Sequence, residues 1–400
     1  MLRTRVQAGI CALFAVLAAS PAAHAITVQT LRAKLAAQQR NLSSTSGAYV
    51  RDLVTGRTLY STRADRTRSP ASNEKLLVTS TALLKYGPDA RLRTILEAES
   101  DPVDGVIDGD VALVGAGDPY LTTTRLRSIA GQLKAQGVEE ITGKVLGDGT
   151  FFDNRRGSYD SAYAYDPDLG GSLGGLVLDY GRGPNPAQYA AEKLRDTLLA
   201  ADIIVRKGPH AGTLGEEGVP VASVTSDPIS TILAKINVPS DNFAAEMLLK
   251  TLGGAFGTAG TTTAGATVVR ETLAELGVTA RPYDGSGLSR ADQVSPREIT
   301  DLLTEMAALP GTGLALRSSL PVAGKTGTLA SRMRGTAAAG RCRAKTGTLR
   351  SVSALSGYCA TPSGHLVAFS FLENNMSEYT AKQVEDRMVA QIARYSDASR

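Results

Sequence analysis

The stretch SPASNEKLLVTSTALLKYGP, residues 69–88, decides how the rest of the sequence is read. Ser69 is a typical N-cap with Pro70 in the first helical position, apolar residues then recur at helical spacing, and Gly87 followed by proline ends the pattern. We therefore predict a helix over this stretch. Ser72 and Lys75 are three residues apart, so they would lie one above the other in its first turn.

This S-x-x-K pair suggests nucleophilic chemistry. A serine hydroxyl is a weak nucleophile until a neighbouring base takes its proton, and a lysine that is removed from water can have a pKa low enough to do so. Backbone N–H groups near the start of a helix can also stabilise an oxyanion. The motif alone is a weak signal, because chance matches are common and a solvated Ser-Lys face is the simpler alternative.

A second stretch, INVPSDNFAAEMLLKTLGG at residues 236–254, places Ser240, Asp241 and Asn242 at the start of another apolar helix. A serine at this position is often only a helix cap. Its place after the S-x-x-K pair is what makes it a candidate for the same site.

The tetrad Lys-Thr-Gly-Thr occurs twice, at residues 325–328 and 345–348. The first copy is followed by a basic, glycine-broken segment, whereas the second is followed by two apolar strand patterns and a turn. A phosphate loop at the first copy would need glycine at position 319, which is serine. We therefore predict that Lys345, Thr346, Gly347 and Thr348 form the functional copy, on the edge of a sheet.

S-x-x-K, S-D-N and K-T-G in this order are the signature of penicillin-binding proteins and class A β-lactamases. Further matches lie in TGRTLYSTRADRTRSPASNEKLLVT, GDVALVGAGDPYLT and YDGSGLSRADQVS. The chain resembles the low-molecular-mass class C penicillin-binding proteins, the D-alanyl-D-alanine carboxypeptidase/endopeptidase family, over most of residues 26–395. In that family the segment before the catalytic triad typically reads Ala-Gly-x-Asp-Gly-Thr-Leu. Residues 323–329 match it, with Lys325 at the variable position and Thr326 in place of aspartate.

The resemblance implies an acyl transfer on peptidoglycan stem peptides, with β-lactam antibiotics as inhibitors. Ser72 would be the nucleophile and Lys75 its base, while Ser240 would pass a proton to the leaving amine and Asn242 would orient Lys75. Lys345 would attract the substrate carboxylate, which Thr346, Gly347 and Thr348 would help to bind. The backbone N–H groups of Ser72 and Thr348 would form the oxyanion hole. No metal and no cofactor is expected.

Two other functions share these motifs. A β-lactamase would need a glutamate for fast deacylation, and Glu246, one turn beyond Asn242, is interpreted as a helix-surface residue. A non-catalytic wall-binding or sensor domain would keep the fold and lose a motif residue, and none is lost.

The expected fold class is α/β of the α+β type. A transpeptidase/β-lactamase-like domain, with an antiparallel five-stranded sheet flanked by helices, is interrupted by an inserted α/β region, because 168 residues separate two serines that must share a cleft. The predicted boundaries are a signal peptide at 1–25, a first part of the domain at 26–90, the insertion at 91–224 and a second part at 225–400. Within the insertion we expect strands near 91–98, 110–114 and 141–146 and helices near 125–137 and 187–200.

The ends and the composition of the chain bear on location. Residues 1–25 combine two arginines, a short apolar run and the exit Ala-His-Ala, which predicts a cleaved export signal and a periplasmic or secreted protein without a transmembrane anchor. Cleavage leaves 41 basic and 39 acidic residues, a net charge of +2 that gives no reason to expect nucleic acid as a partner. His210 and His365 would remain, both in turn-like sequence, so a histidine triad or histidine-rich metal site is not expected.

Two cysteines would remain after cleavage. If Leu349 and Val352 flank a tight turn, antiparallel register places Cys342 opposite Cys359, within disulfide range in an oxidising compartment. The alternative is a pair of reduced thiols, since a bulge or a longer turn would shift the register.

Overall fold

The computed structural model describes residues 25–215 and 218–397. Nearly all of the predicted signal segment 1–25 lies outside this range. Within it, no helix is both long enough and apolar enough to cross a membrane.

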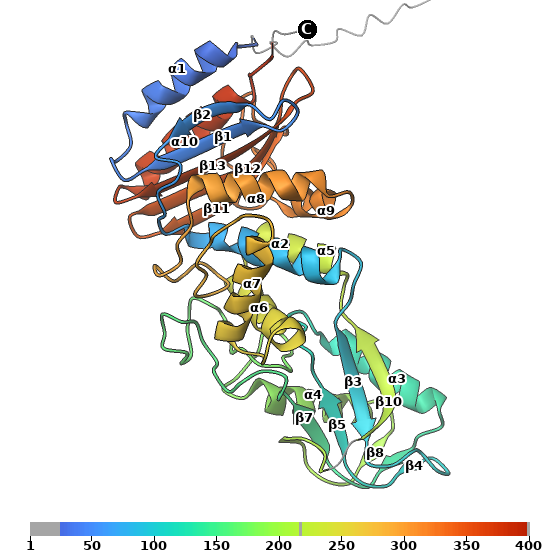
Figure 1. Ribbon diagram of the computed structural model, residues 1–400. Helices are drawn as coiled ribbons and strands as arrows, with labels where there is room; N and C mark the ends of the chain where they lie inside the picture. Colours follow the sequence, from blue (N-terminus) through green and yellow to red (C-terminus); the bar gives the residue numbers. More distant parts are fainter. Residues whose placement is uncertain (1–24, 216–217, 398–400) are drawn as a thin grey trace, which may run out of the picture.

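One end of the molecule is built on a five-stranded antiparallel sheet (Figure 1). Its strands, in spatial order, are β11 (Cys342–Leu349), β12 (Val352–Ala360), β13 (Leu366–Asn374), β1 (Gly47–Asp52) and β2 (Thr58–Thr62). Helices α1 (Val28–Gln39) and α10 (Glu378–Ile392) cover one face, and α8 (Pro296–Ala308) packs on the other. Both faces are therefore buried, and the sheet of the expected fold class is confirmed.

The apolar residues at helical spacing on α10 are part of this core, because Val384, Met388 and Ile392 are all fully buried. The β11–β12 hairpin has the predicted register, with Leu349 opposite Val352. Cys342 therefore lies opposite Cys359, with the Cα atoms 4.1 Å apart, and the two residues form a disulfide, the first of the two alternatives.

A layer of helices lies below the sheet in Figure 1. Its members share one core with α8, and they are α2 (Glu74–Tyr86), α5 (Ile229–Asn237), α6 (Asn242–Phe256), α7 (Thr262–Ala274) and α9 (Thr312–Ser319). Helix α6 is unusual because every residue from Phe243 to Gly253 is buried. It packs against α2 and α7, and also against loops of residues 152–177 through Phe243 and Met247.

The start of the S-x-x-K helix differs from the prediction. Residues Ala71–Asn73 form a 3₁₀ turn, η1, and the α-helix begins only at Glu74, so Ser69 does not cap it. Ala71 has φ +46°, a left-handed conformation that a helix running on from Ser69 could not contain. The stop at the other end is as predicted, because α2 ends at Tyr86 and Gly87 follows with φ +80°.

The far end of the molecule is the inserted α/β region (Figure 1). One mixed sheet contains, in order, β10 (Val219–Thr225), β3 (Arg93–Ala98), β5 (Val111–Val114), β7 (Val145–Asp148) and β9 (His210–Ala211). A small parallel sheet contains β4 (Val106–Ile107), β6 (Glu140–Ile141) and β8 (Ile204–Val205). Helices α3 (Thr123–Ala135) and α4 (Pro186–Leu199) share one apolar core with these strands.

One strand of the insertion was predicted wrongly. The segment 141–146 was expected to be one strand, but it is divided between β6 and β7, which belong to different sheets. The division falls at Gly143, where a Cβ atom would lie 2.1 Å from the carbonyl oxygen of Gly109. The chain needs glycine at this close approach, and the strand is interrupted there.

Candidate active site

The turn η1 presents Ser72 beside Lys75. Lys75 is completely buried, and its Nζ atom donates to Ser72 Oγ at 3.1 Å, to Asn242 Oδ1 at 2.7 Å and to the carbonyl oxygen of Ser286 at 2.5 Å. Burial lowers the pKa of Lys75 to about 8, although nearby carboxylates favour its charged form. A lysine in this state can accept a proton from a serine hydroxyl near neutral pH.

The S-D-N segment approaches the same point from α6. Asp241, not Ser240, is the N-cap, and its side chain accepts the N–H of Ala244. The Ser240 hydroxyl is thus not needed as a cap and instead accepts a hydrogen bond from Lys345 Nζ at 2.8 Å. Ser240 has φ +67°, and non-glycine residues held in this region are often found at functional sites.

The second Lys-Thr-Gly-Thr copy lies on β11, at the edge of the five-stranded sheet. Lys345 is completely buried, and burial together with the charge of Lys75 holds its pKa well below the usual range. A Cβ atom on Gly347 would lie 2.8 Å from the carbonyl oxygen of Pro70, so glycine lets the strand approach η1. The next residue on β11, Thr348, is exposed to solvent.

The edge of β11 also directs the backbone N–H of Thr348 outward. Leu349 and Val352 close a two-residue hairpin, so the next pair, Thr348 and Ser353, does not exchange ladder hydrogen bonds. The N–H of Thr348 therefore points away from β12, at the free edge of the sheet. Ala344, four residues earlier on the same strand, also directs its N–H away from β12 and donates it to the carbonyl oxygen of Pro321.

The first Lys-Thr-Gly-Thr copy lies beside the second without being part of the sheet. Its Gly327–Leu329 segment is the 3₁₀ turn η2, and Thr328 Oγ1 accepts a hydrogen bond from Thr346 Oγ1 at 2.8 Å. Lys325 packs against Gly340. The structure thus links Ser72, Lys75 and Asn242 by hydrogen bonds and pairs Ser240 with Lys345, and the charge of Lys75 acts on Lys345. It places Lys325 in neither group.

Sequence reasoning missed several groups at this site. The carbonyl oxygens of Ser286 and Asp168 bind Lys75 and Asn242, and a backbone acceptor leaves no mark on the residue type. The interpretation of Glu246 as a surface residue was wrong, because it is completely buried and accepts the N–H groups of Gly285 and Ser286. The matched segment YDGSGLSRADQVS was the available signal for this loop.

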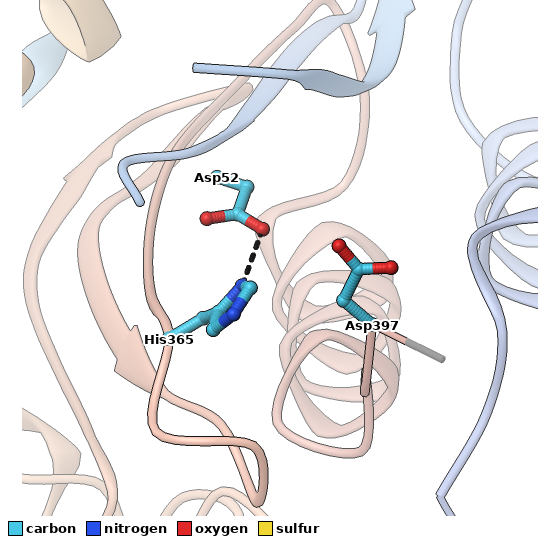
Figure 2. A group of neighbouring side chains, drawn as sticks. All are labelled: Asp52, His365 and Asp397. Atoms are coloured by element: carbon cyan, nitrogen blue, oxygen red, sulfur yellow. Dashed lines mark hydrogen bonds and ion pairs between the residues drawn. The ribbon is translucent and has the colours of Figure 1, made fainter. Parts of the chain in front are cut away.

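His365 is far from Ser72 along the sheet. It directly precedes β13, about 16 Å along the chain direction from Ser370, which pairs with Ser356 at the level of Lys345. Its Nδ1 atom lies 2.7 Å from Asp52 Oδ2. Figure 2 shows this pair with Asp397 beside it. Potential ligand atoms of the three residues lie within 4.8 Å of one another, so among the described residues this is the group that could hold a metal ion.

Asp52 already has other partners at that position. One of its oxygens accepts the N–H groups of Val54 and Thr55, and the other also receives the Tyr395 hydroxyl at 3.4 Å. These contacts tie the segment after α10 to the turn of the first hairpin.

Comparison with known proteins agrees with this geometry. The model of the D-Ala-D-Ala carboxypeptidase 3 (S13) family matches residues 29–169 and 181–395. A D-alanyl-D-alanine carboxypeptidase from Actinomadura sp. (strain R39) is 34% identical, over 88% of this chain and 81% of the relative. Carboxypeptidase DacB from Mycolicibacterium smegmatis is 29% identical, over 82% of this chain and 75% of the relative.

Solved structures show the same fold. Penicillin-binding protein 4 from Haemophilus influenzae superimposes with a TM-score of 0.76 at 20% identity, covering 90% of this chain and 99% of the other. A predatory peptidoglycan endopeptidase from Bdellovibrio bacteriovorus gives a TM-score of 0.59 at 18% identity, covering 87% and 92%. The family match spans most of the chain, and the Actinomadura relative is similar over most of both sequences. The protein therefore belongs to the D-Ala-D-Ala carboxypeptidase 3 (S13) family.

Proposed function

We propose that this protein is a serine D-Ala-D-Ala carboxypeptidase that acts on peptidoglycan stem peptides through an acyl-enzyme on Ser72. The observation that carries the proposal is the position of Lys75, whose Nζ atom contacts Ser72 Oγ and Asn242 Oδ1 in a buried site. The names of the carboxypeptidase relatives support the substrate class.

Acylation begins when neutral Lys75 takes the proton of the Ser72 hydroxyl. The Ser72 oxygen then attacks the carbonyl carbon of the penultimate D-alanine, and the negative charge moves to the carbonyl oxygen. The N–H groups of Ser72 and Thr348 stabilise that oxyanion. Asn242 holds Lys75 in the required direction through its side-chain oxygen.

The K-T-G segment recognises the carboxylate of the terminal D-alanine. The bound carboxylate favours the ammonium form of Lys345, which then supplies positive potential. The hydroxyl of Thr348, and that of Thr346 once it turns from Thr328, donate hydrogen bonds to the carboxylate, while Gly347 keeps β11 close to the nucleophile. A desolvated lysine near a carboxylate gains a charge-assisted interaction, which favours peptides that end in a free carboxylate.

Release of D-alanine completes the first half of the reaction. The C–N bond breaks as the leaving amine takes a proton from the Ser240 hydroxyl, which is re-supplied from the neighbouring lysines; Lys345 already contacts it. Water then attacks the acyl-enzyme and frees Ser72. When the leaving amine belongs to a cross-linked peptide, the same steps give an endopeptidase.

We also propose that the protein works outside the cytoplasmic membrane. The Cys342–Cys359 disulfide supports an oxidising compartment, and peptidoglycan lies outside that membrane.

Intact-mass measurement after mixing with benzylpenicillin tests the proposal. We expect a long-lived adduct of one penicillin per chain, and no adduct on the Ser72→Ala variant. Rapid turnover of penicillin would instead indicate a β-lactamase, and absence of any adduct on the wild-type chain would indicate a wall-binding domain.

A further inference from the structure

Four carboxyl groups are buried around Lys75, and the mechanism above uses none of them. Their side chains are completely buried, and they are Glu74, Glu246, Asp284 and Asp292. Fully buried acids are rare unless they are paired, so their concentration at the one lysine that contacts Ser72 calls for an explanation. Of the four, Glu246 and Asp284 make the hydrogen bonds that suggest a role.

Glu246 holds the loop that binds Lys75. Its Oε1 atom accepts the N–H of Gly285 at 2.9 Å and the N–H of Ser286 at 2.8 Å. The carbonyl oxygen of Ser286 in turn accepts from Lys75 Nζ at 2.5 Å. Ser286 therefore connects the two: its amide is fixed by Glu246, and its carbonyl is directed at Lys75.

Asp284 fixes the other side of the loop. It accepts the N–H groups of Gly287 and Ser289, each at 2.7 Å. Gly287 has φ +80°, and a Cβ atom there would lie 2.0 Å from the carbonyl oxygen of Ala71, the residue before Ser72. The loop of residues 285–289 thus packs between η1, which carries Ser72, and the carboxylates of Glu246 and Asp284. These contacts fix its conformation.

The electrostatics of this group depend on all of its charged members. Burial, followed by the charge of Asp284, raises the pKa of Glu246 to about 7. Glu74 and Lys250 also interact with Glu246 through their charges. The carboxylates of Asp284 and Glu246 favour the ammonium form of Lys75, against the larger effect of burial. A negative charge on Glu246 therefore affects both the position and the protonation of the lysine.

We propose that Glu246 is a positioning residue for acylation, whose carboxylate holds Gly285 and Ser286 so that the Ser286 carbonyl oxygen keeps the Lys75 amine directed at Ser72. This inference rests on the proposed role of Lys75 as the base. Asp284 supports the same loop, and Glu246 is the better test because it contacts the amide of Ser286 itself.

The test compares pH profiles of acylation by a chromogenic β-lactam. Glu246→Gln keeps an oxygen that can accept both N–H groups but removes the charge. Loss of a nearby negative charge lowers the pKa of a lysine, so the midpoint of the rise in acylation rate moves to lower pH by about one unit. Glu246→Ala also removes the acceptor of the two N–H groups. We expect its acylation rate to fall about 10- to 100-fold, by analogy with the loss of a hydrogen-bond partner that orients a metal ligand. The dissociation constant of the non-covalent β-lactam complex should change little.

Glu373→Gln is the matched control. Glu373 is a completely buried carboxyl on β13, and the charges that act on it are those of Glu385 and of Arg63 and Arg68 in the segment after β2. It is not among the charges that act on Lys75. Its substitution leaves the pH midpoint and the acylation rate unchanged.

The outcomes separate the two proposals. A wild-type pH midpoint in Glu246→Gln, or an acylation rate of Glu246→Ala within twofold of wild type, would overturn the role of Glu246 while the Ser72 adduct still forms. Failure of the wild-type chain to form any adduct would instead overturn the proposed function. If Glu246→Ala does not fold, as judged by its circular dichroism and thermal unfolding, the midpoint of Glu246→Gln decides alone.

Discussion

Lys75 makes its three contacts with atoms from three separate parts of the chain, because Ser72, Asn242 and the Ser286 carbonyl lie on a turn, a helix and a loop. Such convergence leaves the amine a single orientation. The neutral form of Lys75 is accessible because burial lowers its pKa to about 8. The three hydrogen-bond partners keep the amine in place. The pH dependence of the reaction follows from that value.

We predict that the acylation rate constant rises with pH and levels off above about 8. The sign follows from the role of Lys75, because the neutral amine that accepts the proton is the form present above its pKa. Stopped-flow acylation by a chromogenic β-lactam measures it, over a range that extends roughly two pH units on either side of the lysine pKa. A rate that falls across this range would exclude Lys75 as the base.

The two Lys-Thr-Gly-Thr copies give a second prediction at the level of single residues. Lys345→Ala should lose roughly 2–4 kcal/mol of transition-state binding with a carboxylate-bearing substrate, the scale of a lost charge-assisted contact in a desolvated site. Lys325→Ala should change kcat/KM little, because Lys325 contacts none of the five candidate catalytic residues through a described hydrogen bond. Steady-state kinetics of both variants check this, and the reverse pattern would move the site to the first copy.

The residues of the three motifs could be predicted because each is a short, ordered signal in which type and spacing are both informative. Glu246 could not. Polar residues on a helix are normally assigned to its exposed face, but α6 is buried on every side from Phe243 to Gly253, so helical periodicity carries no information there. The role of the Ser286 carbonyl was equally hidden, since it depends on backbone direction.

At the level of elements, strand register could be predicted from the sequence, whereas the left-handed backbone conformation before Ser72 could not. The register of the β11–β12 hairpin, with Cys342 opposite Cys359, is the one expected for a tight turn between Leu349 and Val352, because a two-residue turn fixes antiparallel register. The predicted start of α2 was wrong, because tertiary packing overrides the local capping signals. The turn η1 presents Ser72 beside β11, and Ala71 adopts φ +46° in this arrangement.

The disulfide gives a prediction at this scale. It closes a sequence separation of 17 residues, for which the chain-entropy account gives about 3 kcal/mol of stability. A Cys342→Ala/Cys359→Ala variant should lose about this much free energy of unfolding in urea. In a chain that lacks residues 1–25, thiol titration of the unfolded, unreduced protein should find no free thiol, and two reactive thiols per chain would refute the bridge.

At the level of the whole molecule, the insertion contributes to the site instead of only extending from it. Asn242 donates to the carbonyl oxygen of Asp168, the Tyr120 and Tyr180 hydroxyls donate to Asp241, and buried Lys250 forms an ion pair with Asp153. These contacts fasten α6, with its S-D-N segment, to loops of the inserted region. The sequence predicted that an insertion is present, its helices α3 and α4 and its strands β3 and β5. Contacts between segments so far apart in sequence leave no local pattern.

The central claim is that this assembly releases D-alanine through Ser72. The most direct measurement is the release of D-alanine from a muropeptide ending in D-Ala-D-Ala, by the wild-type chain and by Ser72→Ala, with thermal unfolding recorded for both. The account predicts release by the wild type and a loss of at least about 10³-fold in the variant at unchanged stability, since removing a catalytic nucleophile leaves only residual rates. Turnover by Ser72→Ala at a rate near that of the wild type would contradict it.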